Sequence, residues 1–301
     1  MQIKTIKLSH TFDKGQPQEF QALKSVTSII EQGQSISIIG HTGSGKTTYI
    51  EHLNALLLPT EGNINLKYKA ENQSKKTREL EPFVIIEKDI KASKRKIKNI
   101  KEIRKRIGIV FQFAEYQLFE ETIEKDIMFG PITMGIKKEE AKQLATKYLK
   151  IVGLDSEYLE KSPFALSGGQ KRRVALAGIL AMEPEVLVFD EPTAGLDPQG
   201  SQEILGIFDK LHKDGKTIII VTHNLDDALA HTDYTMMFAK GELIKFDDSY
   251  TVLKDVDCLL KNDLEPPKLL DFVNKLESKG MKIPKVKTLE DLVQVLNSNN
   301  E

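Results

Sequence analysis

The stretch GHTGSGKT at residues 40–47 decides the fold, because it fits the pattern G-x-x-x-x-G-K-[ST]. A short apolar run, 35–39, precedes it, and a helical pattern over 46–58 follows it. Glycines let the loop turn its backbone N–H groups inward, and the following helix adds the positive end of its dipole. Lys46 is placed to reach the outer phosphates of a triphosphate, and Thr47 to coordinate Mg²⁺. The residues expected to contact the phosphates are Gly40, His41, Thr42, Gly43, Ser44, Gly45, Lys46, Thr47 and Thr48.

Strands and helices alternate along the rest of the chain. The weakly alternating segment around Ile6 and Leu8 is expected to form an edge strand. Further apolar runs that predict strands are 22–30, 107–111, 186–189 and 217–221. Helical patterns cover 137–152, 168–181 and 200–212. The last two apolar runs are typical of parallel strands buried on both faces, so the chain is predicted to have an α/β core with a parallel sheet.

Composition narrows the possible classes. A chain of 301 residues corresponds to about two domains, and 40% hydrophobic with 29% charged residues is a globular composition. The formal net charge of −1 gives no overall basic field for nucleic acid. A single cysteine, Cys258, excludes a disulfide framework and an all-cysteine zinc site. The apolar runs are too short to span a bilayer, and the N-terminus shows no secretory signal pattern. A peripheral partner of a membrane protein is still allowed.

Two segments lie outside the alternating core. Residues 67–106 hold 15 Lys and Arg against 6 Asp and Glu, a net +9. They are expected to form a solvated hairpin or helix insertion, or a polybasic contact with anionic headgroups or a partner. The segment 252–301 follows with two amphipathic runs after Pro266 and Pro267, and predicts a small helical appendage. That appendage either covers its own core or contacts another subunit.

Polar side chains follow three of the predicted strands. Asp190 and Glu191 end the run 186–189, where Asp190 is expected to hold Mg²⁺ and Glu191 to polarise an attacking water. His223 is a candidate hydrogen-bond donor to the γ-phosphate or that water. Gln112 follows the run 107–111 and is a candidate to complete the shell of Mg²⁺ and water. Capped turns and plain polar strand ends are the structural alternatives. The set suffices for phosphoryl transfer if its members converge.

The sequence LSGGQ at residues 166–170 opens the helical pattern at 168–181. Its serine and glycines would present free backbone N–H groups, which makes it a second candidate anion site. An ordinary helix N-cap by Ser167 explains the same residues equally well.

The order of these motifs resembles that of an ABC-type ATPase over residues 1 to about 245. The segments similar to its Walker A, Q-loop, signature, Walker B, D-loop and H-switch are Gly40–Thr47, Gln112, Leu166–Gln170, Val186–Glu191, Ala194–Asp197 and His223. The resemblance implies a P-loop NTPase core, and two such domains packed head to tail with ATP between them. Ser167, Gly168, Gly169 and Gln170 would then contact the ATP bound to the partner. Phe12 matches the aromatic residue that stacks on adenine, where relatives more often have tyrosine.

A finer resemblance is carried by FQFAEYQLFEET (111–122), DIMFGP (126–131) and QKRRVA (170–175). These segments are similar to the cobalt-transport-type ATPases, and most similar to the second A-type subunit of energy-coupling factor (ECF) transporters. The resemblance implies an A–A′ heterodimer, a membrane T protein whose coupling helix docks near Phe113–Thr122, and exchangeable S proteins contacted indirectly. Packing within the helical subdomain is the alternative for this segment. Ala114 and Ala165 depart from the usual proline and glutamate, and the insertion 67–106 is longer than expected.

The resemblance divides the chain into a nucleotide-binding domain, 1–250, and a C-terminal helical dimerisation appendage, 251–301. The first would contain a helical subdomain at about 113–180 and the basic insertion. The expected function is ATP hydrolysis, with ATP and Mg²⁺, at the cytoplasmic face of the cell membrane, powering an ECF-type importer of vitamins or transition-metal ions. No nucleic acid partner is expected. The alternatives are a non-transport ABC ATPase, related to nucleic acids or iron–sulfur assembly, and a scaffold with a degenerate site.

Overall fold

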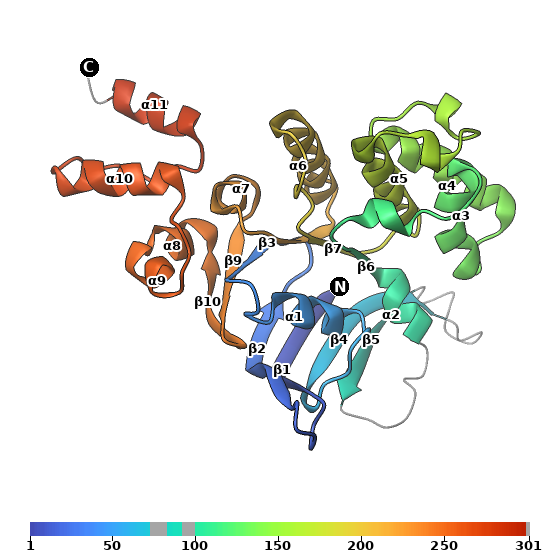
Figure 1. The fold of residues 1–301 in the computed structure, drawn as a ribbon, viewed down its shortest axis with the longest axis horizontal. Coiled ribbons are helices and arrows are strands. Elements are labelled where there is room, and N and C mark those ends of the chain that lie inside the picture. Colours follow the sequence, from blue (N-terminus) through green and yellow to red (C-terminus); the bar gives the residue numbers. More distant parts are fainter. Residues whose placement is uncertain (73–82, 92–99, 299–301) are drawn as a thin grey trace.

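The computed structural model describes residues 1–72, 83–91 and 100–298, and within them the strands form two sheets (Figure 1). The antiparallel sheet has the order β2-β1-β4-β5, formed by β1 (Gln2–Phe12), β2 (Phe20–Ile30), β4 (Glu61–Glu71) and β5 (Phe83–Lys91). The larger sheet has the order β10-β9-β3-β8-β7-β6, formed by β3 (Ser35–Ile39), β6 (Ile107–Val110), β7 (Val186–Asp190), β8 (Thr217–Val221), β9 (Tyr234–Ala239) and β10 (Glu242–Asp248). Only its edge strand β10 runs antiparallel, so the predicted α/β core with a parallel sheet is confirmed.

The larger sheet is buried on both faces, which explains its apolar strands. All residues of β3, β7 and β8 are buried. Leu187 and Phe189 face one core, where Phe189 stacks on Phe208 of α6 with ring centroids 3.7 Å apart. Val186 and Val188 face the other core, which the antiparallel sheet and α1 close. Because successive side chains of a strand point to opposite faces of the sheet, the residues of β7 pack alternately into the two cores.

The described helices fall into three groups (Figure 1). Those that follow the strands are α1 (Lys46–Leu53), α2 (Ile100–Arg106), α6 (Pro198–Lys213) and α7 (Leu225–His231). A cluster beyond β6 contains α3 (Ile123–Thr133), α4 (Lys138–Ile151) and α5 (Gly168–Leu180), packed against one another. Beyond β10 lie α8 (Ser249–Lys254), α9 (Val256–Lys261), α10 (Lys268–Ser278) and α11 (Leu289–Ser298). In the part of the chain that the structure describes, none of these helices has the length and apolar character needed to cross a bilayer.

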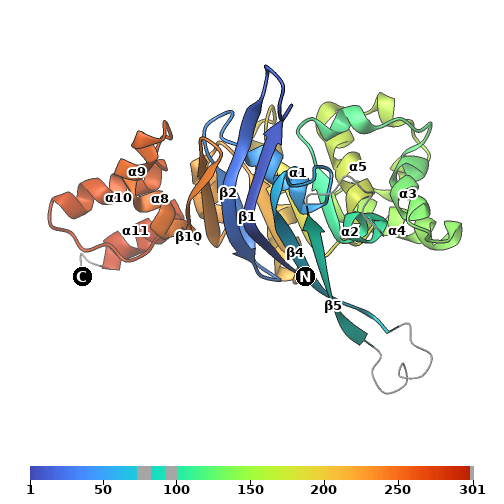
Figure 2. The same ribbon diagram turned by 90° about the horizontal axis from the view of Figure 1, so that it is seen from below.

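The first strand is not an edge strand, which corrects the expectation from its weak alternation. β1 pairs with β2 on one side and with β4 on the other, from Gln2 opposite Lys67 to Ser9 opposite Glu61. β2 and β5 are the edge strands of this sheet, and Figure 2 shows β4 and β5 extending together beyond the body of the molecule. The basic segment therefore supplies β5 and part of β4 to this sheet, in keeping with the hairpin expected for it.

Helix α1 ends at Leu53, five residues earlier than the helical pattern predicted. Ala55 adopts a left-handed conformation with φ 58°. The N–H of Leu56 donates to the carbonyl of Glu51, and the N–H of Ala55 donates to that of His52. This is the hydrogen-bond pattern of a Schellman C-cap, in which glycine usually takes the left-handed position. With alanine there, the sequence carried no stop signal before Pro59.

The two peripheral segments take the expected secondary structure where they are described. Residues 83–91 and 100–106 form β5 and α2, in keeping with a hairpin and helix, while 73–82 and 92–99 lie outside the described residues. In the C-terminal segment, Val273 of α10 and Leu292 of α11 share a small core with Ile283 and Val286. The appendage therefore covers a core of its own, and residues 299–301 lie outside the description.

Candidate nucleotide-binding site

Residues 40–47 form the predicted loop between β3 and α1. Gly40 has φ 151°, and a Cβ there would lie 2.3 Å from the carbonyl oxygen of Phe238. Gly45 has φ 101°, and its Cβ would lie 2.7 Å from the carbonyl oxygen of Ala22. Both positions exclude any side chain, so the loop depends on glycine at each end. Helix α1 begins at Lys46 with its first N–H groups directed at the loop.

The Lys46 ammonium lies across this loop. Lys46 is buried, and its Nζ donates to the carbonyl oxygens of Gly40 at 2.7 Å and His41 at 3.1 Å. Burial lowers the pKa of Lys46, and the nearby carboxylates of Glu191 and Asp190 oppose that shift. Ser44 Oγ is buried in the same loop and, among the described residues, has no hydrogen-bond partner. The loop thus holds a cation and an unused hydroxyl where an anion would bind.

Asp190 stands at the carboxyl end of β7, beside the start of α1. The Thr47 hydroxyl donates to Asp190 Oδ2 at 3.3 Å. Burial raises the pKa of Asp190, while the hydrogen bond from Thr47 and the charge of Lys46 lower it. These two oxygens fit a Mg²⁺ ion, which is usually held by one or two protein oxygens together with phosphates and waters.

Glu191 and His223 face each other at the same edge of the sheet. His223 Nε2 lies 3.1 Å from Glu191 Oε1, although the angle does not make a hydrogen bond. Glu191 has φ 51°, held by its N–H donating to the carbonyl of Val221. Burial, with the charge of Asp190, raises the pKa of Glu191 to about 7. Burial also lowers the pKa of His223. The pair therefore offers a proton acceptor beside a neutral hydrogen-bonding ring.

Gln112 and the loop polar residues lie near this centre with fewer contacts. Gln112 lies two residues after the end of β6 and is exposed, and Val110 of that strand pairs with Phe189 of β7. It therefore reaches the same carboxyl edge as Asp190. His41, Thr42 and Thr47 are exposed, and Thr48 is half-buried on the first turn of α1. The structure brings the loop, Asp190, Glu191 and His223 together, with Gln112 beside them.

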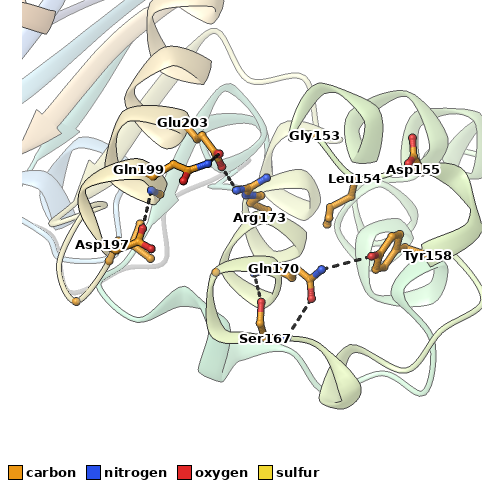
Figure 3. A pocket seen from close by; sticks show the side chains of 14 residues that line it. Gly153, Leu154, Asp155, Tyr158, Ser167, Gln170, Arg173, Asp197, Gln199 and Glu203 are labelled. Carbon is orange, nitrogen blue, oxygen red and sulfur yellow. Dashed lines mark hydrogen bonds and ion pairs between the residues drawn. The ribbon is translucent and has the colours of Figure 1, made fainter.

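The LSGGQ turn lies on a different surface. Ser167 caps α5 by accepting from the N–H of Gln170 at 3.3 Å, and Gln170 Oε1 accepts from the N–H of Ser167 at 3.1 Å. Ser167 therefore is the helix N-cap that was the structural alternative for this motif. The turn is nevertheless exposed at a cavity of about 580 Å³ (Figure 3). Residues 195–197 and 199–200, after Glu191, line the other side of the cavity, and none of residues 40–48 does. One chain therefore does not close its own loop with its own LSGGQ turn.

Sequence reasoning missed several residues of this cavity. Figure 3 shows the Arg173 side chain of α5 directed at Glu203 of α6, with which it forms an ion pair. Tyr158 accepts a hydrogen bond from Gln170 at 3.4 Å on the opposite side. The sequence held one signal for them, the pair Arg172-Arg173 after LSGGQ. Two neighbouring arginines indicate that acidic or other hydrogen-bonding partners lie close to them in the fold.

Phe12 ends β1 beside a pair of buried histidines. Its ring is 37% exposed and makes an edge contact with His10, with centroids 4.5 Å apart. His10 Nδ1 lies 3.0 Å from the carbonyl of Leu58 and 3.1 Å from His52 Nε2. His52 Nδ1 lies 2.6 Å from the carbonyl of Thr48. Carbonyls only accept, so each ring carries a proton on Nδ1, and burial lowers the pKa of both histidines, which favours the neutral form.

We expect the buried pair to make folding stability fall in acid. Burial lowers the pKa of His52 from 6.5 to about 4. Between these two pH values, His52 is protonated in the unfolded chain and neutral in the folded chain. Stability is complete above pH 6.5 and falls by roughly 3 kcal/mol as the pH drops to 4. His52→Gln should flatten this part of the curve in urea unfolding between pH 7 and 5. Equal slopes for the two proteins would contradict the assignment.

Aromatic side chains follow Gln112 and point outward. The aromatic patch, defined here as Phe113, Tyr116, Phe119 and Phe129, is 44–84% exposed. Ala114 and Leu118 alternate with it and are buried against the helical cluster. Internal packing therefore explains the two aliphatic residues but leaves the four aromatic ones without a cover in the described chain. An apolar patch of this kind is typical of a protein interface.

Comparison with known proteins agrees with this geometry. The sequence model of the family "ABC transporter" matches residues 23–194. The chain is 60% identical over 299 residues to the energy-coupling factor transporter ATP-binding protein EcfA2 of Mycoplasma mobile, covering 99% of this chain and 96% of the relative. It is 54% identical to the same protein of Mycoplasmopsis pulmonis, covering 99% and 96%.

Solved structures show the same relation. CbiO1 from Clostridium perfringens, part of the ABC transporter complex CbiONQ, has a TM-score of 0.68 at 32% identity, covering 90% of this chain and 98% of that one. The ATP-binding cassette MJ0796, solved as a dimer bound to ADP and phosphate, has a TM-score of 0.65 at 28% identity, covering 82% and 98%. The chain therefore belongs to the ABC transporter family, and within it to the ATP-binding proteins of energy-coupling factor transporters.

Proposed function

We propose that this chain hydrolyses ATP in an ECF-type importer of vitamins or transition-metal ions, as one of two paired ATPase subunits at the cytoplasmic face of the membrane. One observation carries the proposal: the chain presents two half-sites on different surfaces. The loop 40–47 with Asp190 and Glu191 forms one, and the LSGGQ turn at its own cavity forms the other. Two such chains arranged head to tail complete both sites, and the relatives' name and the dimeric cassette MJ0796 support this arrangement.

The residues divide the work of phosphoryl transfer. Residues 40–48 bind the phosphates, with Lys46 turning from the loop carbonyls to the β- and γ-phosphates, and Phe12 stacks on the adenine. Thr47 and Asp190 would hold Mg²⁺, with Gln112 at the edge of its shell, and the ion would supply positive charge against the phosphates. Glu191 accepts the proton of the attacking water, and His223 donates a hydrogen bond to the γ-phosphate.

The partner subunit supplies the second face of the nucleotide. Ser167, Gly168, Gly169 and Gln170 of one subunit would contact the γ-phosphate held by the other, using the free N–H groups at the start of α5. ATP then favours the closed pair because only the closed pair makes these contacts. We take residues 1–250 as the nucleotide-binding domain and 251–301 as the dimerisation appendage. The exposed Leu289 and Val293 of α11 support a subunit contact there.

The aromatic patch is the proposed docking surface for the membrane T component, with S components held through it. Replacing Tyr116 and Phe119 with aspartate puts charge on a surface that must be desolvated on docking. We expect the doubly changed chain to lose at least about 90% of the membrane protein that co-purifies with a tagged parental chain in detergent. Its ATP affinity should stay within about twofold, because neither residue contacts the loop.

The matched control changes two exposed aromatic residues elsewhere. Phe20 on β2 and Phe83 on β5 are 58% and 49% exposed, and they lie on the antiparallel sheet instead of the patch. Their replacement with aspartate should leave co-purification unchanged. If a membrane protein is captured equally by all three chains, docking does not use the patch. If the parental chain captures no membrane protein, the transporter assignment itself is wrong.

A further inference from the structure

Arg172 lies where three segments of the proposed site meet. It belongs to the second turn of α5 and is only 7% exposed. Its Nε and Nη2 donate to the two carboxylate oxygens of Glu115, at 3.1 and 2.9 Å. Its Nη1 donates to the carbonyls of Pro192 at 3.2 Å and Ala194 at 2.7 Å. One guanidinium thus joins the LSGGQ helix to two other segments.

The first of these segments belongs to the proposed docking surface. Glu115 lies in the short 3₁₀ turn Ala114–Gln117, between the exposed rings of Phe113 and Tyr116. Burial alone would raise the pKa of Glu115, but the hydrogen bonds and charge of Arg172 hold it below its ordinary value. The two groups therefore form a charged, bidentate and largely buried ion pair. Such a pair is costly to break, because either partner alone leaves a buried charge.

The second segment begins at Glu191. The N–H of Ala194 donates to the carbonyl of Glu191 at 3.2 Å, so the turn 191–194 closes on the proposed general base. Arg172 donates to two further carbonyls of this turn, those of Pro192 and Ala194. Phe113, Arg172 and Glu191 also line a common cavity, so the docking segment, α5 and the turn after Glu191 meet at one place.

We propose that Arg172 is a positioning residue that ties the docking segment around Glu115 to the turn that carries Glu191. Movement of the docking segment against a membrane partner then changes the place of Glu191, and hydrolysis becomes dependent on that partner. The inference rests on the proposed function, because it takes the aromatic patch as the docking surface and Glu191 as the base. It adds the physical connection between them.

Arginine is required at this position for a geometric reason. Its planar fork presents five N–H donors, and here four hydrogen bonds run in two directions to a carboxylate and to two carbonyls. A lysine ammonium is a point charge with three donors, and cannot span both partners from one stem. Arg172→Lys should therefore keep the helix and the positive charge but lose the connection.

The test separates the two halves of the connection in the intact transporter, isolated through a tag on this chain. Glu115→Gln removes the charged link but keeps the contacts of Arg172 with the turn, and Arg172→Met removes both while keeping the stem. We expect kcat for ATP hydrolysis to fall at least about fivefold in Glu115→Gln and about tenfold or more in Arg172→Lys and Arg172→Met. The Kd for a fluorescent ATP analogue should stay within about twofold in all three. The double variant should be no slower than Arg172→Met alone.

The control is Lys147→Met, which removes an exposed ion pair with Glu183 in the same helical cluster and should hydrolyse ATP at the parental rate. If Glu115→Gln or Arg172→Lys hydrolyses ATP with the parental kcat, the inference is wrong and the proposed function still stands. A loss of kcat and nucleotide affinity together also overturns the inference, because it marks a structural role. A parental transporter that does not hydrolyse ATP overturns the proposed function, and the inference with it.

Discussion

Replacing Glu191 with glutamine should stop ATP turnover and leave ATP binding intact. Glutamine keeps the size of the side chain but cannot accept the proton of an attacking water. General base catalysis contributes about 10²- to 10⁴-fold, so we expect kcat to fall at least about 100-fold. The Kd for ATP should stay within about twofold, since Lys46 and the loop are unchanged. Hydrolysis of radiolabelled ATP by the purified ATPase pair measures the first quantity, and equilibrium binding measures the second.

The same variant should accumulate as a closed pair with ATP and Mg²⁺, seen as an earlier peak in size-exclusion chromatography. The matched control adds Gly169→Arg, because a Cβ at Gly169 meets no atom within 4 Å in the described chain. The single chain therefore tolerates the change, but the larger side chain would block the nucleotide in the partner's site. We expect the double variant to elute as separate subunits. Parental turnover in Glu191→Gln would show that another group is the base.

Replacing Lys46 with alanine should remove most of the affinity for ATP. The ammonium is buried, and among the described residues its hydrogen bonds go to two backbone carbonyls, so the loop already holds a cation that can turn to a phosphate. Its loss leaves the phosphate charge to backbone N–H groups and Mg²⁺. We expect the Kd for ATP to rise at least about tenfold, or about 1.4 kcal/mol. Isothermal titration with ATP and Mg²⁺ measures the change.

Lys24→Ala is the control for this change. Lys24 lies on β2, is half-buried with its side chain 40% exposed, and makes an ion pair of 3.9 Å with Glu242. Exposed pairs contribute little, so neither ATP affinity nor unfolding should change measurably. If Lys46→Ala binds ATP as tightly as the parental chain does, the loop 40–47 is not the phosphate site. Unfolding curves for both variants show whether the fold has survived.

The local elements were predictable from the sequence because their signals are local. The strands 35–39 and 217–221 appear with the bounds that their apolar runs predicted. Ser167 forms the N-cap that its position before two glycines indicated. The loop 40–47 needs glycine at positions where any Cβ would strike a backbone carbonyl, and the sequence shows that requirement directly. In each case a few neighbouring residues determine the backbone.

Other features depended on partners distant in the chain. The interior place of β1 follows from pairing with β4, more than 50 residues away, which period-two alternation does not report. The early end of α1 follows from the left-handed conformation of Ala55, which cannot be predicted from the residue type because alanine rarely adopts it.

The sequence by itself determined the phosphate loop, the parallel α/β core and the identity of the catalytic candidates, because those depend on residue type and short spacing. Three features became visible only in the folded chain. Asp190 accepts a hydrogen bond from Thr47, and the LSGGQ turn lies on a different surface from the loop 40–47. Arg172 joins Glu115 to the turn after Glu191. The physical reason is that these contacts join residues 20 to 143 positions apart, and their geometry is set by how strands and helices pack.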